Sequence, residues 1–231
     1  MMTSNVMIVC NLKMHPVSKI IETYALMLSN EPIGLLLPYP YLSAAIEKFS
    51  ESQIWIGAQG VSEHDIGAYT SQISGKMLSE IGVETVLIGH SEVRALGVDV
   101  AAQLSIAKSC GFHVIYCIGE VSETFNSGEL LSQLSILPPM NNLTIAYEPV
   151  WCIGTGRLPS YDEINRCVKL IRTWLSRNYT GNHQSIRVLY GGSIDNKNCK
   201  AVLSHTDIDG FLIGGASLDP RRILEVVERC K

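Results

Sequence analysis

Eight short apolar segments, separated by stretches with helical periodicity, constrain the fold more than any other feature of this sequence. They are rich in Val, Ile and Leu and cover residues 6–11, 34–37, 53–57, 85–89, 114–119, 143–147, 187–191 and 210–214. Between them apolar residues recur every three or four positions, as in Ile20, Tyr24, Met27 and Leu28, which is typical of one face of a helix. Continuously apolar strands indicate a sheet covered on both faces, and their alternation with helices predicts parallel strand order.

Eight strand–helix units in 231 residues favour a closed (β/α)8 TIM barrel, with eight parallel strands inside and the helices outside. The alternative is an open doubly wound sheet, which usually carries a glycine-rich fingerprint after its first strand. Here the first segment ends in Asn11-Leu12-Lys13, which disfavours that alternative. No linker or low-complexity tract divides the chain, so we expect residues 1–231 to form a single TIM-barrel domain.

The composition excludes several classes of protein. Hydrophobic residues make up 46% of the chain, but no apolar run approaches the roughly 20 residues of a membrane span, so we expect no membrane contact. The net charge of −4 and the lack of a Lys/Arg block argue against nucleic acid as a partner. Seven cysteines without a CxxC pair predict free thiols in a cytoplasmic protein, with no metal site.

Polar side chains stand where three of the predicted strands end, which is where barrel enzymes carry their chemistry. Asn11 and Lys13 follow the first strand, His90 follows the fourth and Glu148 the sixth. For Lys13 the alternative is a surface lysine, and for His90 it is a capping or packing histidine. A carboxylate directly after a buried strand is costly unless it is partnered, so Glu148 is either an ion-paired structural residue or a catalytic base.

Paired glycines follow the last two strands, at Gly191-Gly192 and Gly214-Gly215. Glycines allow backbone N–H groups to approach an anion, and the loops after strands seven and eight are the common phosphate site of this fold. Each pair alone is compatible with a plain tight turn. Their presence after both strands makes phosphate binding the better interpretation.

The segment 149–156 has an apolar tip, with proline at one end and Gly-Thr-Gly at the other. Exposed loops rarely carry Val, Trp, Cys and Ile together. One interpretation is an ordinary loop with a buried tryptophan. The other is a lid that closes over a ligand.

Six segments of this sequence resemble the triosephosphate isomerase family, and they occur in the order typical of that family. They are residues 11–14, 88–92, 117–120, 146–156, 190–193 and 212–218. The stretch Ala-Tyr-Glu-Pro-Val-Trp-Cys-Ile-Gly-Thr-Gly is the most specific of them. The resemblance implies a TIM barrel that interconverts dihydroxyacetone phosphate and D-glyceraldehyde 3-phosphate, through an enediolate, in glycolysis and gluconeogenesis.

The resemblance also implies a role for each polar residue at the strand ends. Glu148 would be the base that moves a proton between the two carbons. His90 would act as a neutral electrophile, and Lys13 would supply a fixed positive charge. Asn11 would donate a hydrogen bond to the carbonyl oxygen, and Glu92 would be a second carboxylate near Lys13. No cofactor or metal is implied.

The phosphate would rest on backbone N–H groups of Gly154, Ser193, Gly214 and Gly215. The implied lid consists of Pro149, Val150, Trp151, Cys152, Ile153, Gly154, Thr155 and Gly156. By the same resemblance, Tyr190 and Ser193 would latch the closed lid, and Glu120 would be the partner of Trp151 in the open lid.

The sequence departs from the family pattern near the expected subunit interface. The family usually forms a homodimer through a long third loop, here residues 58–74, with Thr70 reaching Asn11 of the neighbouring copy. An ion pair that the family usually has near this interface is replaced by Gln72 and Val93. Because both charges are absent, no buried charge is stranded, and we expect the dimer to survive.

The lid and the outer helices also show departures. Cys152 stands where the family usually has Ala, and Arg157 where it usually has Lys. Cysteine is small and apolar enough to fit, so we expect near-normal closure together with sensitivity to thiol reagents. The chain is shorter than the roughly 250 residues typical of the fold, and we expect little helix between Glu120 and Leu143.

Two other classes of function remain as alternatives. A phosphate-binding epimerase or a Schiff-base aldolase on a similar barrel would need metal-binding His and Asp at strand ends or a lysine deep in a later strand. Neither pattern is visible in the sequence. A non-catalytic relative should have lost Glu148, His90 or Lys13, and all three are present.

Overall fold

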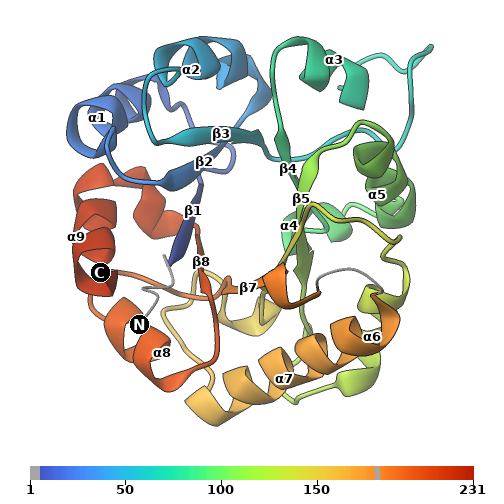
Figure 1. Cartoon of the computed structure of the whole chain (residues 1–231), viewed down its shortest axis with the longest axis vertical. Helices are drawn as coiled ribbons and strands as arrows, with labels where there is room; N and C mark the ends of the chain where they lie inside the picture. Colours follow the sequence, from blue (N-terminus) through green and yellow to red (C-terminus); the bar gives the residue numbers. More distant parts are fainter. Residues whose placement is uncertain (1–5, 180–182) are drawn as a thin grey trace.

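The computed structural model describes residues 6–179 and 183–231, which build one closed barrel of parallel strands. Each strand pairs with the next one in sequence, and β1 pairs with β8 to close the ring (Figure 1). The strands are Met7–Asn11 (β1), Ile33–Leu37 (β2), Trp55–Ala58 (β3), Thr85–Ile88 (β4), His113–Ile118 (β5), Leu143–Tyr147 (β6), Arg187–Tyr190 (β7) and Gly210–Ile213 (β8). The predicted (β/α)8 barrel is therefore confirmed.

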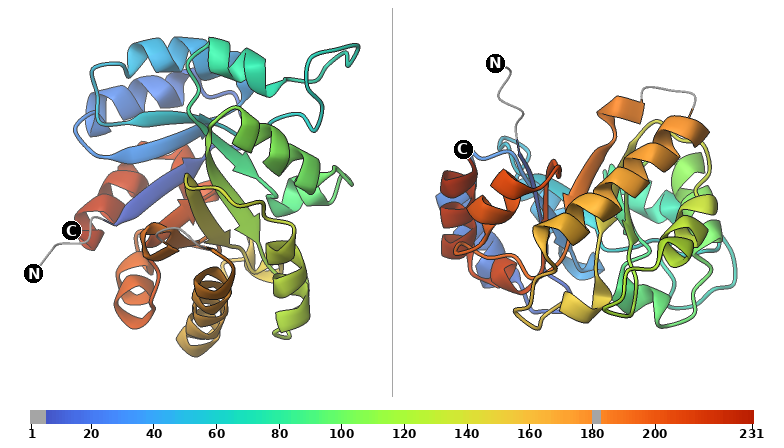
Figure 2. Two further views of the ribbon diagram at one scale, coloured as in Figure 1. Left: turned by 45° about the vertical axis from the view of Figure 1, so that its right-hand side comes forward. Right: turned by 90° about the horizontal axis from the view of Figure 1, so that it is seen from below.

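The α-helices surround the ring of strands (Figures 1 and 2). They are Ser18–Leu28 (α1), Leu42–Lys48 (α2), Gly75–Glu80 (α3), Ser91–Arg94 (α4), Val100–Ser109 (α5), Ser127–Ser135 (α6), Tyr161–Asn178 (α7), Cys199–His205 (α8) and Pro220–Cys230 (α9). Short 3-10 turns lie at Tyr39–Tyr41 (η1), Val150–Cys152 (η2), His183–Ser185 (η3) and Gly215–Leu218 (η4).

The core has two apolar layers because alternate strand residues point to opposite faces of the sheet. A small inner cluster fills the barrel with residues from seven of the strands, namely Val9, Leu36, Leu87, Ile115, Cys117, Ala146, Leu189 and Leu212. A larger cluster lies between the strands and the helices. Burial on both faces explains why the strands read as unbroken apolar runs.

Two helix starts show how the local sequence begins a helix. Ser160 and Glu163 form a capping box at the start of α7, which satisfies N–H groups that have no partner within the helix. Asp219 caps α9, and Pro220 occupies the first helical position, where the missing N–H costs nothing. Both helices thus begin at residues that satisfy the first turn of the helix.

Two sequence-based expectations about secondary structure need correction. The third strand begins at Trp55 instead of residue 53, because the Ser52 hydroxyl accepts a hydrogen bond from the Ile54 N–H (2.9 Å) and holds a turn there. The region between Glu120 and Leu143 contains a nine-residue helix, α6. Asn126 caps it by accepting a hydrogen bond from the Glu129 N–H at 3.2 Å, a signal that the expectation of little helix overlooked.

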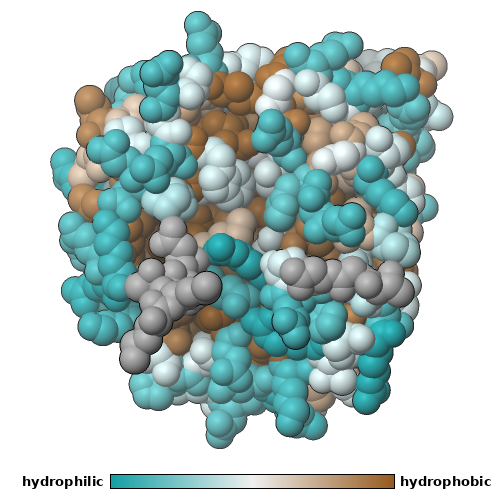
Figure 3. All heavy atoms as spheres, in the orientation of Figure 1, coloured by the Kyte–Doolittle hydropathy of each residue, from teal (hydrophilic) through white to brown (hydrophobic). Residues whose placement is uncertain are grey.

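All seven cysteines are free, as predicted, and five of them are buried. In the face of the molecule shown in Figure 3, hydrophilic residues cover much of the lower edge, over α7. Within the described residues, every helix is too short or too polar to cross a bilayer.

Candidate functional site

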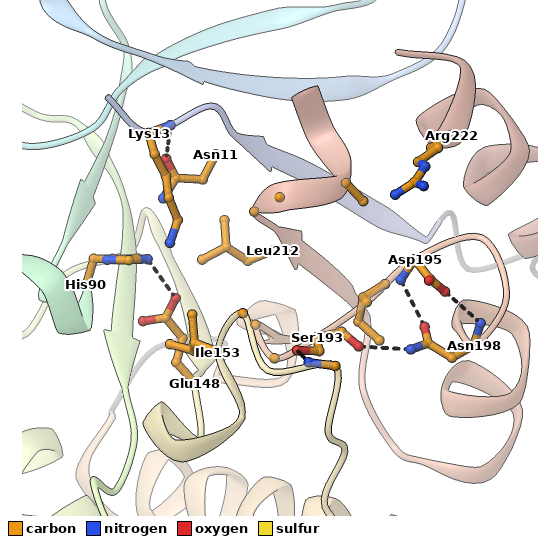
Figure 4. Close-up of a pocket in the computed structure, with 18 residues that line it drawn as sticks. Asn11, Lys13, His90, Glu148, Ile153, Ser193, Asp195, Asn198, Leu212 and Arg222 are labelled. Atoms are coloured by element: carbon orange, nitrogen blue, oxygen red, sulfur yellow. Dashed lines mark hydrogen bonds and ion pairs between the residues drawn. The ribbon is translucent and has the colours of Figure 1, made fainter. Parts of the chain in front are cut away.

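One cavity of about 460 Å³ opens at the C-terminal ends of the strands (Figure 4). It is lined by Asn11, Lys13, His90, Glu148, Ile153, Gly154, Gly156, Gly191, Gly192, Ser193, Ile194, Asp195, Asn198, Leu212, Gly214, Gly215, Ala216 and Arg222. The cavity thus brings together four of the five predicted catalytic residues and all four predicted phosphate-binding residues. Glu92 does not line it but pairs with Lys13 at its edge.

Strand periodicity places three of these residues at the cavity. Val9, Ala146 and Leu212 point into the barrel. Residues two positions further along a strand point the same way, and these are Asn11, Glu148 and Gly214. The side chains at these positions therefore point to the same side of the sheet as the inner layer of the barrel and reach the cavity at its C-terminal end.

Glu148 is buried, with an exposed fraction of 1%. Burial raises the pKa of its carboxyl group, and the nearby His90 and Arg94 lower it only in part. Its Oε2 has no hydrogen-bond partner within the described residues. A raised pKa and a free oxygen suit a general base that must accept a proton from a ligand.

Two glycines make room for Glu148. A Cβ atom on Gly119 would lie 1.7 Å from the Glu148 carbonyl oxygen, and one on Gly191 would lie 2.7 Å from its Cγ. Neither distance is compatible with a side chain. The position of the carboxyl group therefore depends on two glycines that follow β5 and β7.

His90 precedes α4 and directs one ring nitrogen toward Glu148. Its Nδ1 accepts a hydrogen bond from the Glu92 N–H (3.3 Å), which assigns the ring proton to Nε2. Nε2 lies 3.3 Å from Glu148 Oε1. The ring therefore presents an N–H donor to the same part of the cavity as the carboxylate.

Lys13 has a left-handed backbone, with φ of 50°, which is uncommon for a residue other than glycine. Its N–H donates to Asn11 Oδ1 (3.1 Å), and its carbonyl accepts from Gln59 Nε2 (3.1 Å). These bonds hold the strained turn, and the ammonium group forms an ion pair with Glu92. Backbone strain at such a place is typical of a functional site.

Arg94 supports the site from outside the cavity, and the sequence analysis missed this role. Its Nη1 donates to the carbonyls of Gly89 (2.6 Å) and Cys117 (2.9 Å), and its Nη2 donates to that of Gly119 (3.2 Å). One guanidinium thus joins the ends of β4 and β5 beside Glu148. The only signal in the sequence was its place two residues after Glu92.

Ser193 holds the predicted lid at two points. Its hydroxyl donates to the Cys152 carbonyl (2.7 Å) and accepts from the Gly156 N–H (3.2 Å). Tyr190, at the end of β7, is buried, and its hydroxyl has no partner within the described part of the chain. The predicted latch therefore has one engaged residue, Ser193, and one unengaged residue, Tyr190.

Glu120 is predicted to pair with Trp151 in the open lid; in this structure, where Ser193 bonds the lid, the two residues contact other groups. Glu120 Oε1 accepts from the Tyr147 hydroxyl (3.0 Å), and Oε2 has no partner among the described residues. The Arg157 guanidinium lies over the Trp151 ring, with its Cζ atom 5.0 Å from the ring centroid. A cation over an aromatic face is a favourable contact that competes for the indole.

Cys152 is buried within the lid, and burial raises the pKa of its thiol to about 12. Because the thiolate is the reactive form, such a thiol reacts slowly. The expected sensitivity of this residue to thiol reagents is thus not supported by its environment. Arg157, at the end of the lid, forms an ion pair with Glu123.

Four residues that line the cavity have backbone N–H groups without a partner in the described part of the chain. Those of Gly154, Ser193, Gly214 and Gly215 donate to no acceptor within the described residues. Gly154 has a left-handed φ of 70°, which glycine adopts without strain. Free N–H groups of this kind are suited to bind the oxygens of an anion.

Several residues at the cavity escaped the sequence analysis. Asp195, Asn198 and Arg222 line it, but they lie in the loop after β7 and the first turn of α9, where charged residues are ordinary. Thr70, by contrast, is exposed in the loop between β3 and α3 and does not line the cavity. Within the described residues, no group of three or more His, Cys, Asp or Glu side chains is placed to hold a metal ion.

Comparison with known proteins decides the family. A family model described as Triosephosphate isomerase matches residues 6–230. The chain belongs to the triosephosphate isomerase family. The predicted family and the predicted class of enzyme are thereby confirmed.

Curated members of the triosephosphate isomerase family are similar over most of their length. The triosephosphate isomerase of Neurospora crassa is 37% identical over 204 residues, covering 83% of this chain and 82% of the relative. That of Chlamydia felis is 38% identical over 210 residues, covering 84% and 83%. That of Azoarcus sp. is 39% identical over 196 residues, covering 79% and 80%.

Proposed function

We propose that this chain interconverts dihydroxyacetone phosphate and D-glyceraldehyde 3-phosphate, with Glu148 as the base. Membership of the triosephosphate isomerase family supports the reaction. The observation that carries the residue assignment is a buried carboxylate of raised pKa, 3.3 Å from an imidazole N–H donor, in one cavity. A base and a hydrogen-bond donor at adjacent atoms are what an enediolate mechanism requires.

In the proposed reaction Glu148 removes a proton from the carbon beside the carbonyl and returns it to the neighbouring carbon. The electrons of the broken C–H bond form the C=C bond of the enediolate, and the π electrons of the carbonyl move onto its oxygen. His90 donates its Nε2 proton to that oxygen and takes up the proton of the neighbouring hydroxyl, so that the two oxygens exchange roles and every proton is accounted for. His90 Nε2–H and the Asn11 amide donate hydrogen bonds to the two oxygens. The Lys13 ammonium stabilises the developing negative charge, and no electrons leave the substrate.

The phosphate is proposed to rest on the free N–H groups of Gly154, Ser193, Gly214 and Gly215. The phosphate oxygens carry negative charge, and hydrogen bonds to a charged acceptor are stronger than those to a neutral one. Segment 149–156, which Ser193 bonds at Cys152 and Gly156, is proposed to cover the substrate and exclude water. Exclusion of water protects the enediolate from losing phosphate.

A coupled assay with D-glyceraldehyde 3-phosphate tests the proposed function. We expect turnover, and we expect EDTA to leave the rate unchanged because every proposed step uses side chains and backbone N–H groups. Turnover lost on chelation would point to a metal-dependent reaction. An absence of turnover in both conditions would leave the non-catalytic alternative.

We further propose that the chain forms a homodimer in the cytoplasm. The loop between β3 and α3 projects away from the barrel (Figure 2). It carries apolar side chains to its tip, with Ile66 70% exposed, and a stack of His64 on Tyr69 gives it internal order. An exposed apolar loop of this kind is typical of a protein interface. The free cysteines suit a reducing compartment.

The dimer is tested by Thr70→Arg. We expect the unmodified chain to elute in gel filtration at about twice its 25.4 kDa, and the variant to elute at the mass of one chain. A large charged side chain in an interface is expected to separate the copies because it is desolvated without a partner. Thr173→Arg, on the exposed face of α7, is the matched control and should stay dimeric. Elution of the unmodified chain as a monomer at micromolar concentration would contradict the proposal.

A further inference from the structure

Arg222 is a second cationic side chain at the catalytic cavity, and the proposed mechanism does not use it. It lies in the first turn of α9 and lines the cavity together with Gly214 and Gly215. In Figure 4 it lies across the cavity from His90 and Lys13. Arg222 thus faces the same cavity as the four residues whose backbone N–H groups are proposed to bind the phosphate.

The Arg222 guanidinium has no hydrogen bond or ion pair in the described part of the chain. An arginine on a helix often pairs with an acidic residue three positions later, which here is Glu225. That carboxylate instead accepts a hydrogen bond from Asn196. The charge of Arg222 therefore remains available to a ligand.

Asp195 also lines the cavity, and its negative charge would repel the dianion that the cavity is proposed to bind. The positive charge of Arg222 counters this repulsion. Its Oδ1 accepts hydrogen bonds from the N–H groups of Lys197 (2.8 Å) and Asn198 (3.2 Å), which hold the loop after β7 in shape. The carboxylate thus has a structural task but opposes the approach of an anion. A guanidinium on the same wall offsets that opposing field.

We propose that Arg222 is a substrate-recognition residue that attracts the phosphate group of the substrate from the side of α9. This inference rests on the proposed function, and it adds a side-chain cation to a site otherwise built from backbone N–H groups. Because Arg222 is exposed and acts partly through solvent, its contribution is modest and depends on salt. We expect it to act on binding, since it lies across the cavity from His90 and Lys13.

The test compares Arg222→Ala with Arg221→Ala. The two arginines are adjacent and exposed on α9, but Arg221 does not line the cavity, so the control removes the same charge. We expect Arg222→Ala to raise KM for D-glyceraldehyde 3-phosphate and the inhibition constant of inorganic phosphate by a similar factor, about three- to tenfold. Its kcat should stay within about twofold, as expected when uniform binding is lost. Arg221→Ala should change neither constant.

Salt dependence and a conservative variant give further readouts. The kcat/KM of the unmodified chain should fall more steeply with ionic strength than that of Arg222→Ala. Arg222→Lys should restore most of the loss, because it keeps the charge. Equal effects of the two alanine variants would overturn the proposal, as would a lower kcat with unchanged KM.

The binding of inorganic phosphate, measured by calorimetry, separates this inference from the proposed function. Weaker phosphate binding by Arg222→Ala than by Arg221→Ala would support the role of Arg222 even if the chain showed no isomerase turnover. Equal phosphate binding by the two variants would overturn it even in an active isomerase.

Discussion

Replacement of Glu148 by Gln is expected to lower kcat by at least about 1,000-fold, because the amide cannot accept the proton that the reaction moves. Glu148→Asp keeps the carboxylate but withdraws it by one methylene, and we expect a loss of at least about tenfold from misplacement alone. Both variants are to be compared with the unmodified chain in the coupled isomerase assay. Near-normal turnover in either variant would remove Glu148 as the base.

The substitution Glu148→Gln is also expected to stabilise the fold at neutral pH. Burial raises the pKa of Glu148 above its ordinary value of 4.5, so the folded chain holds this proton more tightly than the unfolded chain does. The contribution of Glu148 to stability is therefore full below pH 4.5 and is lost as the pH rises through the raised pKa. The melting temperature of Glu148→Gln should exceed that of the unmodified chain at pH 7, and the gap should close toward pH 4. A lower melting temperature at pH 7 would contradict this account.

Lys13→Met is expected to lower kcat/KM by roughly 100-fold or more, because it removes the fixed charge beside the reacting oxygens while nearly preserving side-chain length. The partner carboxylate, Glu92, is 58% exposed, so its loss of an ion pair should cost little stability. Steady-state kinetics and a melting curve measure the two effects separately.

Lys76→Met is the matched control for this substitution. Lys76 is exposed and lies 3.4 Å from Asp65, so the control also removes one lysine and one ion pair. Its kinetic constants should equal those of the unmodified chain. A similar loss of activity in both variants would show that net charge, and not the place of Lys13, is responsible.

The sequence was sufficient to predict the strands and the residues at their ends. Unbroken apolar runs show the strands, and because side chains alternate along a strand, Asn11 and Glu148 follow the direction of Val9 and Ala146. The closed ring then requires residues from distant parts of the chain to meet at one rim.

The contacts that side chains of different loops make with one another could not be predicted from the sequence. Arg94 bonds three carbonyls at strand ends, Trp151 lies under Arg157, and Glu120 bonds the Tyr147 hydroxyl. Arginine and carboxylate side chains are long and have several acceptors or donors within reach, so the packing of the loops decides among them. The same holds for Cys152, whose burial depends on how the lid is folded against Ser193.

The glycines of the cavity set unequal limits on how this enzyme can diverge. Around the base, any side chain at Gly119 or Gly191 would collide with Glu148, so mutation there removes the chemistry before it alters the substrate. At the opposite end Gly215 has open space around its Cβ position and no left-handed φ. A new side chain at that position would keep the backbone N–H and narrow or recharge the pocket beside it. Substitutions at Gly215 can therefore alter which ligands the cavity accepts, whereas substitutions at Gly119 or Gly191 displace the catalytic base.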